Sequence, residues 1–340
     1  MKPISRAAGA AFTIALAACA SVAGAAAQDL VPIRFGTNWV AQAEHGGYYQ
    51  AVVDGTYAAC GLDVEIVPGG PQANNRMLLP VGRIDFYMGG NLVQAFSAIQ
   101  QDIPTMVVAA SFQKDPQILM SHPGQGFDTF ESLKDSDDIL IGREGLATFY
   151  QWLRVAHGFS EEKVRPYTFS PAPFIINPRA VQQGYLTSEP FAVETEAGFT
   201  PNVFLLADQG FATYATTIET RRELVETQPE VVQCFVDGSA IGWYNYLYGD
   251  NAAANEMIKR DNPEMTDDKL AYSLEKLKEY GIVDSGDTLT LGIGAMTHER
   301  FESFFEQMVE AGLFAADLDY RQAYTLDFVN KGVGLELRPQ

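Results

Sequence analysis

The sequence is poor in the residues that build metal and thiol sites. It holds three cysteines, Cys19, Cys60 and Cys234, and four histidines, all far apart along the chain. There is no Cys-x-x-Cys pair and no metal-ligand spacing, which argues against a metal centre. The motifs Gly-x-Ser-x-Gly, His-Glu-x-x-His, the P-loop and the dinucleotide-binding Gly-x-Gly-x-x-Gly are missing too. The sequence therefore indicates no catalysis and no cofactor.

Basic side chains are also scarce. The chain has 23 Lys and Arg against 43 Asp and Glu, for a formal net charge of −20. A surface this acidic repels phosphate backbones and anionic lipid, so nucleic acid is excluded as a partner. The charge favours solubility, and we expect a monomer.

The sequence has one long apolar stretch, and it lies at the N-terminus. Lys2 and Arg6 precede an alanine-rich run, and small residues follow it up to Ala27. This is the layout of a secretory signal cleaved after residue 27, and the run is too short and alanine-rich for a permanent membrane span of about 20 residues. We therefore predict an exported chain. A lipoprotein signal that ends at Cys19 stays open as an alternative.

The two remaining cysteines, Cys60 and Cys234, would meet oxidising conditions after export. Such conditions permit a disulfide. We prefer to interpret each as a separate buried, small apolar residue. Their pairing stays open.

Strand-like and helix-like segments alternate from residue 31 onward. Such alternation predicts a parallel sheet with crossover helices, in a three-layer α/β lobe. The pattern resumes after Lys114, so we expect a second lobe of the same class. In the first lobe we expect strands at 31–39, 62–69, 84–90 and 104–112, and helices at 46–61, 72–82 and 91–101.

Long helices are expected from Thr216 onward. Two capping-box patterns, Thr216 with Glu219 and Thr227 with Glu230, predict helix starts. Three further helices are expected near 251–260, 267–280 and 295–311. The chain would then cross twice between lobes, near 111–115 and 208–214, where we expect hinges. The predicted organisation is a signal peptide (1–27), a discontinuous lobe 1 (28–112 plus 210–340) and a lobe 2 (113–209).

Four loops that follow predicted strands and open predicted helices carry the candidate ligand-binding residues, because α/β lobes bind ligands there. Aromatic faces stack on heteroaromatic rings, and Asn, His or Glu can hydrogen-bond ring nitrogens and amines. Glycines let a ligand approach the backbone. Glu189 is expected in extended backbone before Pro190. The candidates are Asn38, Trp39, His45, Tyr48, Gly89, Gly90, Asn91, Phe149 and Glu189 in these loops, together with Tyr214 at the second crossing between the lobes.

Five stretches carry a resemblance to a known family. They are "NWVAQAEHGGYYQA" from Asn38, "YAACGLDVEIVPGG" from Tyr57, "GRIDFYMGG" from Gly82, "QQGYLTSEPF" from Gln182 and "FVNKGVGLEL" from Phe328. The chain resembles the substrate-binding proteins of ABC importers with the periplasmic binding-protein type II fold. Within them it is similar to the group that binds thiamine-precursor pyrimidines, riboflavin, sulfonates and nitrate. The resemblance covers nearly all of the mature chain.

The resemblance implies an α/β protein of two lobes that close on a ligand in a central cleft, without catalysis, in the periplasm. An ABC permease and its ATPase would be the partners. Nitrate or a sulfonate needs several donors, whereas Trp39, Phe149 and Glu189 favour a flat, neutral or partly cationic heterocycle of the thiamine-precursor pyrimidine type. Riboflavin, with its larger hydroxylated tail, and a sulfonate stay as alternatives. An enzyme similar to the eukaryotic pyrimidine synthase is less expected, because its cysteine-rich motif is missing.

Overall fold

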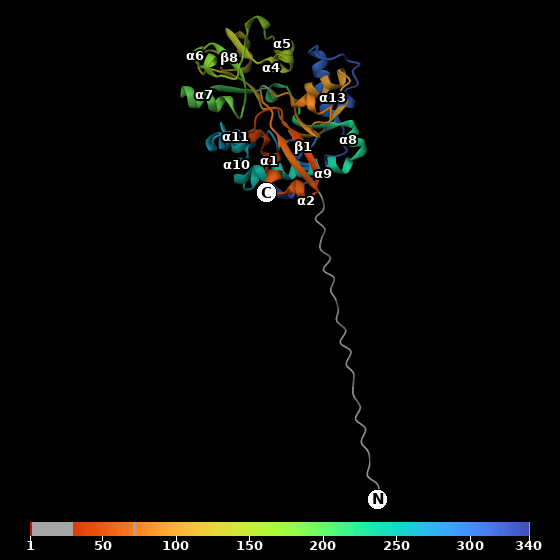
Figure 1. Cartoon of the computed structure of the whole chain (residues 1–340). Helices are drawn as coiled ribbons and strands as arrows, with labels where there is room; N and C mark the ends of the chain where they lie inside the picture. The colour runs from red at the N-terminus through yellow and green to blue at the C-terminus, as the bar shows by residue number, and fades with distance from the viewer. Residues whose placement is uncertain (2–29, 71–72, 340) are drawn as a thin grey trace.

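Two five-stranded sheets organise the computed structural model, which describes residues 1, 30–70 and 73–339 (Figure 1). The predicted signal segment, Cys19 included, lies outside the described residues apart from Met1. The strand order is β2-β1-β3-β10-β4 in the first sheet and β7-β6-β8-β5-β9 in the second. The strands are β1 (Val31–Gly36), β2 (Leu62–Val67), β3 (Phe86–Asn91), β4 (Thr105–Phe112), β5 (Gln117–Ser121), β6 (Asp138–Ile141), β7 (Val164–Pro166), β8 (Ala180–Tyr185), β9 (Asn202–Leu205) and β10 (Ala215–Arg221).

Helices cover the faces of both sheets. The α-helices are α1 (Gly46–Val53), α2 (Thr56–Ala59), α3 (Leu92–Gln100), α4 (Arg143–Ala147), α5 (Phe149–His157), α6 (Ala172–Ile176), α7 (Glu189–Ala197), α8 (Arg222–Thr227), α9 (Pro229–Tyr248), α10 (Ala252–Asp261), α11 (Asp267–Glu279), α12 (Thr288–Leu291) and α13 (His298–Glu310). Short 3₁₀ turns add to them, among which η1 (Ala43–His45) and η2 (Asn75–Leu78) lie near the cleft described below.

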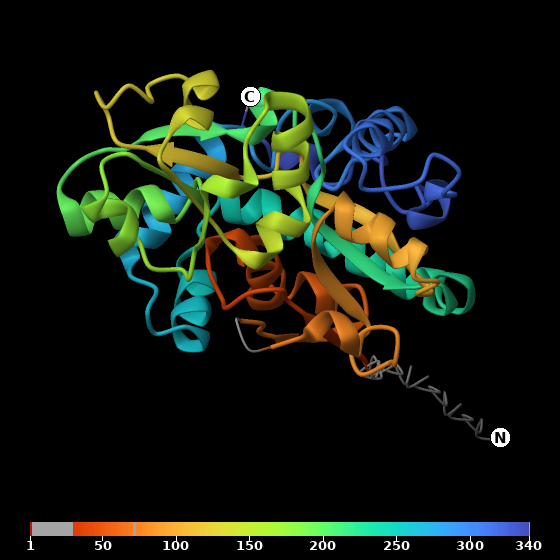
Figure 2. The same ribbon diagram turned by 90° about the horizontal axis from the view of Figure 1, so that it is seen from above.

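The second sheet is built from one continuous stretch of chain, β5 to β9, whereas the first takes strands from both sides of that stretch. Figure 1 shows the yellow-to-green segment at the top of the molecule and the red and orange segments below it. Figure 2 shows the molecule from above, with the yellow-to-green segment overlapping the rest. We call the part around the first sheet lobe 1 and the part around the second sheet lobe 2. This two-lobe α/β arrangement is the type II periplasmic binding-protein fold. The exact lobe ends stay a prediction.

The strand β10 corrects two expectations. It pairs antiparallel with both β3 and β4, so the first sheet is mixed and not all-parallel. Thr216 and Glu219 lie inside this strand, and the capping-box interpretation of that pair is wrong. The run Ala-Thr-Thr-Ile-Glu-Thr is buried on both faces and rich in β-branched residues, which favour a central strand.

Three helix boundaries also differ from expectation. Thr227 ends α8, and α9 begins two residues later at Pro229, where a missing N–H is tolerated. The helix expected over 46–61 breaks at Gly55, whose φ of +70° suits glycine. The helix expected over 72–82 is reduced to the 3₁₀ turn η2.

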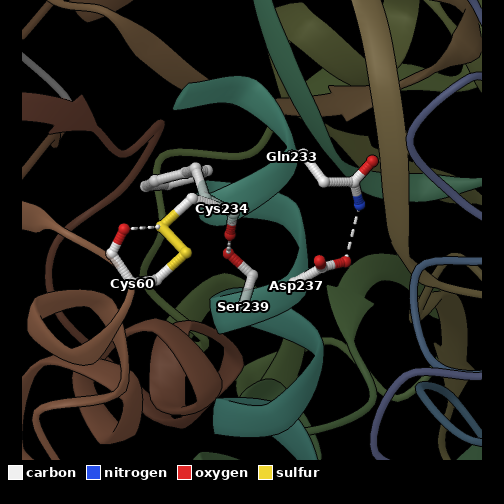
Figure 3. The surroundings of a disulfide bond; sticks show 6 residues. Cys60, Gln233, Cys234, Asp237 and Ser239 are labelled. Carbon is white, nitrogen blue, oxygen red and sulfur yellow. Dashed lines mark hydrogen bonds between the residues drawn. A yellow bond between two sulfur atoms is a disulfide. The ribbon is translucent and has the colours of Figure 1, made fainter. Parts of the chain in front are cut away.

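The core of lobe 1 is aromatic and centred on α9. Phe235 of α9 stacks on Phe86 of β3 with ring centroids 4.0 Å apart, and Trp243 packs against Tyr48. Cys234, on the same helix, forms a disulfide with Cys60 at the end of α2 (Figure 3). The preferred interpretation of two separate buried cysteines is therefore wrong, and Cys60 is exposed.

Candidate ligand-binding cleft

The two lobes contact each other through side chains of the predicted loops. The Trp39 indole, after β1, lies against the ring of Phe169 in the loop between β7 and α6, with ring centroids 5.0 Å apart. The Thr187 hydroxyl, between β8 and α7, donates a hydrogen bond to the carboxylate of Glu44 in η1. Both contacts join lobe 1 to lobe 2, so the structure is closed around the cleft between them.

On the lobe 1 side, Asn91 caps α3 and reaches the crossing between the lobes. Its side-chain oxygen accepts from the Val93 N–H at 3.1 Å, and its amide donates to the Asp115 carboxylate at 3.2 Å. Asp115 also accepts from the Gln117 N–H at 3.1 Å. Burial raises the pKa of Asp115 to about 6, and these two hydrogen bonds only partly oppose that rise. A buried carboxylate thus sits at the predicted hinge.

On the lobe 2 side, the half-buried Glu189 is the first residue of α7. Its two carboxylate oxygens accept from the Tyr167 hydroxyl at 2.9 Å and from the Tyr185 N–H at 2.7 Å. Burial raises the pKa of Glu189, and both hydrogen bonds act against the rise. The expectation of extended backbone before Pro190 is wrong, because proline fits the first turn of a helix.

The electrostatic character of the cleft is acidic. Burial raises the pKa of the Tyr185 phenol, and four nearby carboxylates raise it further. Lys269 of α11 faces this cluster and lowers the pKa of both Glu44 and Glu189. One ammonium against several carboxylates leaves a field that attracts cations and repels anions. The four carboxylates are those of Asp115, Glu144, Glu44 and Glu189.

An aromatic group joins the two lobes at Trp39. The ring of Phe169 lies 5.3 Å from that of Tyr167 and 5.0 Å from that of Trp39, and Phe169 is 56% exposed. Its φ of +64° lies in the left-handed region, which a bulky side chain rarely adopts. Sequence reasoning missed both lobe 2 aromatics, although a Tyr-Thr-Phe run directly after a strand is a signal of the same kind as those it used.

Other predicted contact residues lie inside the lobes. The Tyr48 hydroxyl hydrogen-bonds that of Ser111 at 2.7 Å in the lobe 1 core. The Tyr214 hydroxyl accepts from the Thr297 N–H at 3.0 Å, and its ring is covered by the Arg300 guanidinium at 4.1 Å. Phe149 is buried in lobe 2. Packing inside the lobes is enough to explain why these three side chains are aromatic. Their contact with a ligand stays a prediction.

His45 and the two glycines of β3 complete the predicted set. His45 is fully buried, its ring nitrogens have no hydrogen-bond partner among the described residues, and burial lowers its pKa to about 3. A β-carbon at Gly89 would collide with the carboxylate of Glu219, so close packing requires glycine there. The Gly90 N–H donates to the Gln94 side chain at 3.0 Å, and Asn38 is half-buried beside Trp39.

A half-open cavity of about 270 Å³ is lined by residues of both lobes. It lies along α3 and η2 of lobe 1, and residues of the α4 segment of lobe 2 close one side. Among the described residues, no cluster of three or more metal-ligating side chains occurs. Within the same part of the chain, no helix is long and apolar enough to cross a membrane.

Comparison with known proteins identifies the family. The family model described as "NMT1/THI5 like" matches residues 42–253. The chain belongs to the NMT1/THI5-like family. Among curated relatives, it is 25% identical over 328 residues to the riboflavin-binding protein RibY of Chloroflexus aurantiacus, with 94% of this chain and 92% of RibY covered.

Two solved structures illustrate how widely the fold of this NMT1/THI5-like chain is used. The periplasmic sulfonate-binding protein SsuA from Methylobacillus flagellatus KT matches with a TM-score of 0.60 and 16% identity, over 88% of this chain and 93% of SsuA. The desulfurization enzyme DSZB matches with a TM-score of 0.57 and 12% identity, over 89% of this chain and 98% of DSZB. The fold therefore hosts both binding proteins and an enzyme, and function has to be argued from the site.

Proposed function

We propose that this protein is the extracytoplasmic substrate-binding component of an ABC importer. It captures a small, flat heterocycle of the thiamine-precursor pyrimidine type in the periplasm and delivers it to a membrane permease with its ATPase. The observation that carries the proposal is the acidic, aromatic meeting of the lobes, where Trp39 of lobe 1 packs on Phe169 and Tyr167, next to Phe169, holds Glu189. An indole face accepts a stacked ring, and a carboxylate accepts hydrogen bonds from an exocyclic amine.

The charges of the cleft support a neutral or cationic ligand over an anion. A nitrate or sulfonate would face the carboxylates around Tyr185 with Lys269 as the opposing charge. Bringing an anion into such a site costs desolvation without compensating donors. A protonated or amine-bearing ring would instead be attracted by these carboxylates, and its N–H groups would donate hydrogen bonds to them. The sulfonate alternative is therefore the less supported one.

The arrangement of the cleft supports binding without catalysis. Nucleophilic catalysis needs a nucleophile within hydrogen-bond reach of a base. The ring nitrogens of His45 have no hydrogen-bond partner among the described residues. Cys60 and Cys234 are consumed in the disulfide between α2 and α9. Binding energy in this protein would go into closing the lobes.

A riboflavin-type ligand is the second candidate. The half-open cavity of about 270 Å³, lined by both lobes, favours it, since a bare pyrimidine leaves that space unused. The similarity to RibY, over 94% of this chain, points the same way.

The proposal is tested by thermal shift and calorimetric titration of the purified protein with an aminopyrimidine, thiamine, riboflavin, taurine and nitrate. A heterocycle should raise the melting temperature, with a stabilisation of about 2.7 kcal/mol at a hundredfold excess over Kd. Stabilisation by taurine or nitrate alone would overturn the ligand class. A response to none of the five would remove the support for a heterocycle importer.

Two substitutions place the ligand in the cleft. Trp39→Ala and Glu189→Gln should each weaken binding about 10-fold to 100-fold, because each removes a stacking face or a charged acceptor. The exposed Glu162→Gln is the matched control for Glu189→Gln and should leave affinity unchanged. A loss of unfolding free energy as large as the loss of binding free energy would instead assign either residue to the core.

A further inference from the structure

Two segments carry the chain from one sheet to the other. The first crossing is residues 113–116, between β4 and β5, and the second crossing is residues 210–214, between the 3₁₀ turn η5 (Leu206–Gln209) and β10. Gln113 of the first crossing and Thr213 of the second are buried. Because lobes move about a hinge through changes in the backbone angles of such segments, the contacts of these two crossings decide which motions are open to the lobes.

The two crossings run side by side, since the sheets pair their ends. In lobe 1, Phe112 at the end of β4 pairs with Ala215 at the start of β10. In lobe 2, Ile118 of β5 pairs with Leu205 of β9. Between these two pairs, the residues that the structure describes form no strand ladder. The middle of the hinge therefore lacks the backbone hydrogen bonds that join its two ends.

One side chain, that of Arg300 in α13, contacts both crossings in this gap. Its Nε donates to the Ala212 carbonyl at 3.1 Å, and one terminal nitrogen donates to the Thr213 carbonyl at 3.2 Å. The same terminal nitrogen donates to the carbonyl of Gln113 in the first crossing. Below the guanidinium lies the ring of Tyr214, whose centroid is 4.1 Å away. The rigid, planar fork of arginine thus joins three backbone carbonyls of two separate segments.

The donors of Arg300 are directed at the hinge. Within the described residues, every hydrogen bond of its side chain ends on one of the two crossings, including a longer one of 3.5 Å to the Gln113 side chain. Burial lowers the pKa of the guanidinium, and Tyr214 and Asp287 act against that fall. Taking a charge out of water costs free energy. Charge-assisted hydrogen bonds to the carbonyls offset this cost and make the link a strong one.

Other contacts of the crossings hold one of them alone or lie at the surface. Gln307, one α13 residue further from the start of the helix, donates to the Gly210 carbonyl of the second crossing at 2.9 Å. Lys114 of the first crossing pairs with Asp208, before the second, at 2.9 Å, but their side chains are 34% and 47% exposed. Exposed ion pairs contribute little. Arg300 is therefore the stronger link between the two crossings.

We propose that Arg300 is the positioning residue of the hinge: by bonding to both crossings it makes them bend together, so that the lobes open and close without twisting against each other. Twisting would carry Thr187 away from Glu44 and Phe169 away from Trp39, the pairs that meet across the lobes. The inference goes beyond the proposed function, because it concerns the motion of the lobes whichever ligand they close on.

The width of the lobe-to-lobe distance distribution tests the proposal in the ligand-free protein. Spin labels are attached through a keto amino acid placed at two exposed positions, Glu162 of lobe 2 and Ala253 of α10, which leaves the cysteines untouched. Double electron–electron resonance then measures the distances between the labels. Arg300→Met should make the distribution about twice as wide as in the wild type, because the two crossings can then bend independently.

Gln307→Met is the matched control, because it removes a hydrogen bond from the same helix to the second crossing alone. It should leave the width of the distribution unchanged. A wild-type width in Arg300→Met, with or without a lower melting temperature, would overturn the proposal and make Arg300 a packing residue only. Equal broadening in both variants would overturn it as well, since loss of a contact to one crossing would then be enough.

Arg300→Lys covers the case in which Arg300→Met does not fold. Its ammonium keeps the positive charge near Tyr214 but lacks the planar fork that reaches three carbonyls. The folded Arg300→Lys protein should also give a broader distribution than the wild type. A wild-type width in that variant would show that the fork is not what joins the crossings, and the proposal would fall.

Discussion

The two walls of the cleft are built differently. Behind the lobe 1 wall, the Tyr48 hydroxyl hydrogen-bonds that of Ser111 within its own lobe, and Gly89 packs closely under Glu219. On the lobe 2 wall, Thr187 and Phe169 make their contacts across the gap, to lobe 1. The residues packed within lobe 1 therefore act as a fixed template, whereas Thr187 and Phe169, with their lobe 1 partners Glu44 and Trp39, make contacts that exist when the lobes meet. Substitutions in the first set should change stability, and those in the second set should change affinity.

Removal of the disulfide should have the largest effect, and this effect should be on stability alone. The variant with both Cys60→Ser and Cys234→Ser loses a cross-link over 174 residues within lobe 1. Its free energy of unfolding should fall by about 2–4 kcal/mol, measured by urea denaturation. Ligand affinity at a temperature where the variant stays folded should be unchanged. A parallel loss of affinity would contradict the division between the walls.

Asp115 should make stability depend on pH. Its pKa is about 6 in the folded protein against an ordinary value of 3.8, so the folded state holds the extra proton in that window. The contribution of Asp115 to the free energy of unfolding is fully present below about pH 4. It is lost as the pH rises through 6, and the loss is at most about 3 kcal/mol. Asp115→Asn has no titrating group at this position. Between pH 4 and 7, the unfolding free energy of the wild type should therefore fall relative to that of Asp115→Asn, by at most about 3 kcal/mol.

Urea denaturation of both proteins at several pH values measures this difference. Comparison with the variant cancels the contributions of Glu44 and Glu189, whose pKa values are raised by burial as well. A difference that stays constant from pH 4 to pH 7 would show that Asp115 is not protonated at the crossing.

Thr187→Val should have the smallest effect and should appear in affinity. It removes the donor to Glu44, whose other carboxylate oxygen already has no partner among the described residues, so the closed state would bury an unsatisfied carboxylate. Such a group costs about 1–3 kcal/mol, so calorimetry should find binding roughly 5-fold to 160-fold weaker. Thr217→Val is the matched control, since that hydroxyl is buried without a partner. Equal effects of the two variants would mean that Thr187 does not bridge the lobes.

The sequence predicted the architecture well where local pattern and long-range packing agree. The strands over β1 to β4, the helix α3 and the later helices α10, α11 and α13 follow directly from periodicity. The strand β10 did not, because Thr216 and Glu219 match a helix start locally. Its strand state comes from pairing with β3 and β4, partners more than a hundred residues away in the chain.

The candidate site was predictable in its loops but not in its side chains. Trp39, Asn91 and Glu189 were singled out and lie at the meeting of the lobes. Phe169 and Thr187 were not, because each gains its role from a partner on the other lobe. One sequence shows which residues follow a strand. It does not show which of them face each other after closure.

The central position of β10 also constrains the order in which the chain can fold. Lobe 2 is continuous and can be completed first, whereas the sheet of lobe 1 has a gap between β3 and β4 until residue 221 is available. Cys234 follows that strand after α8 and the first turn of α9, and reaches Cys60 from α9, which packs on the completed sheet. Oxidation of this one pair is therefore expected to follow the placement of the late strand, and a thiol-trapping assay during refolding of the reduced protein would date that event.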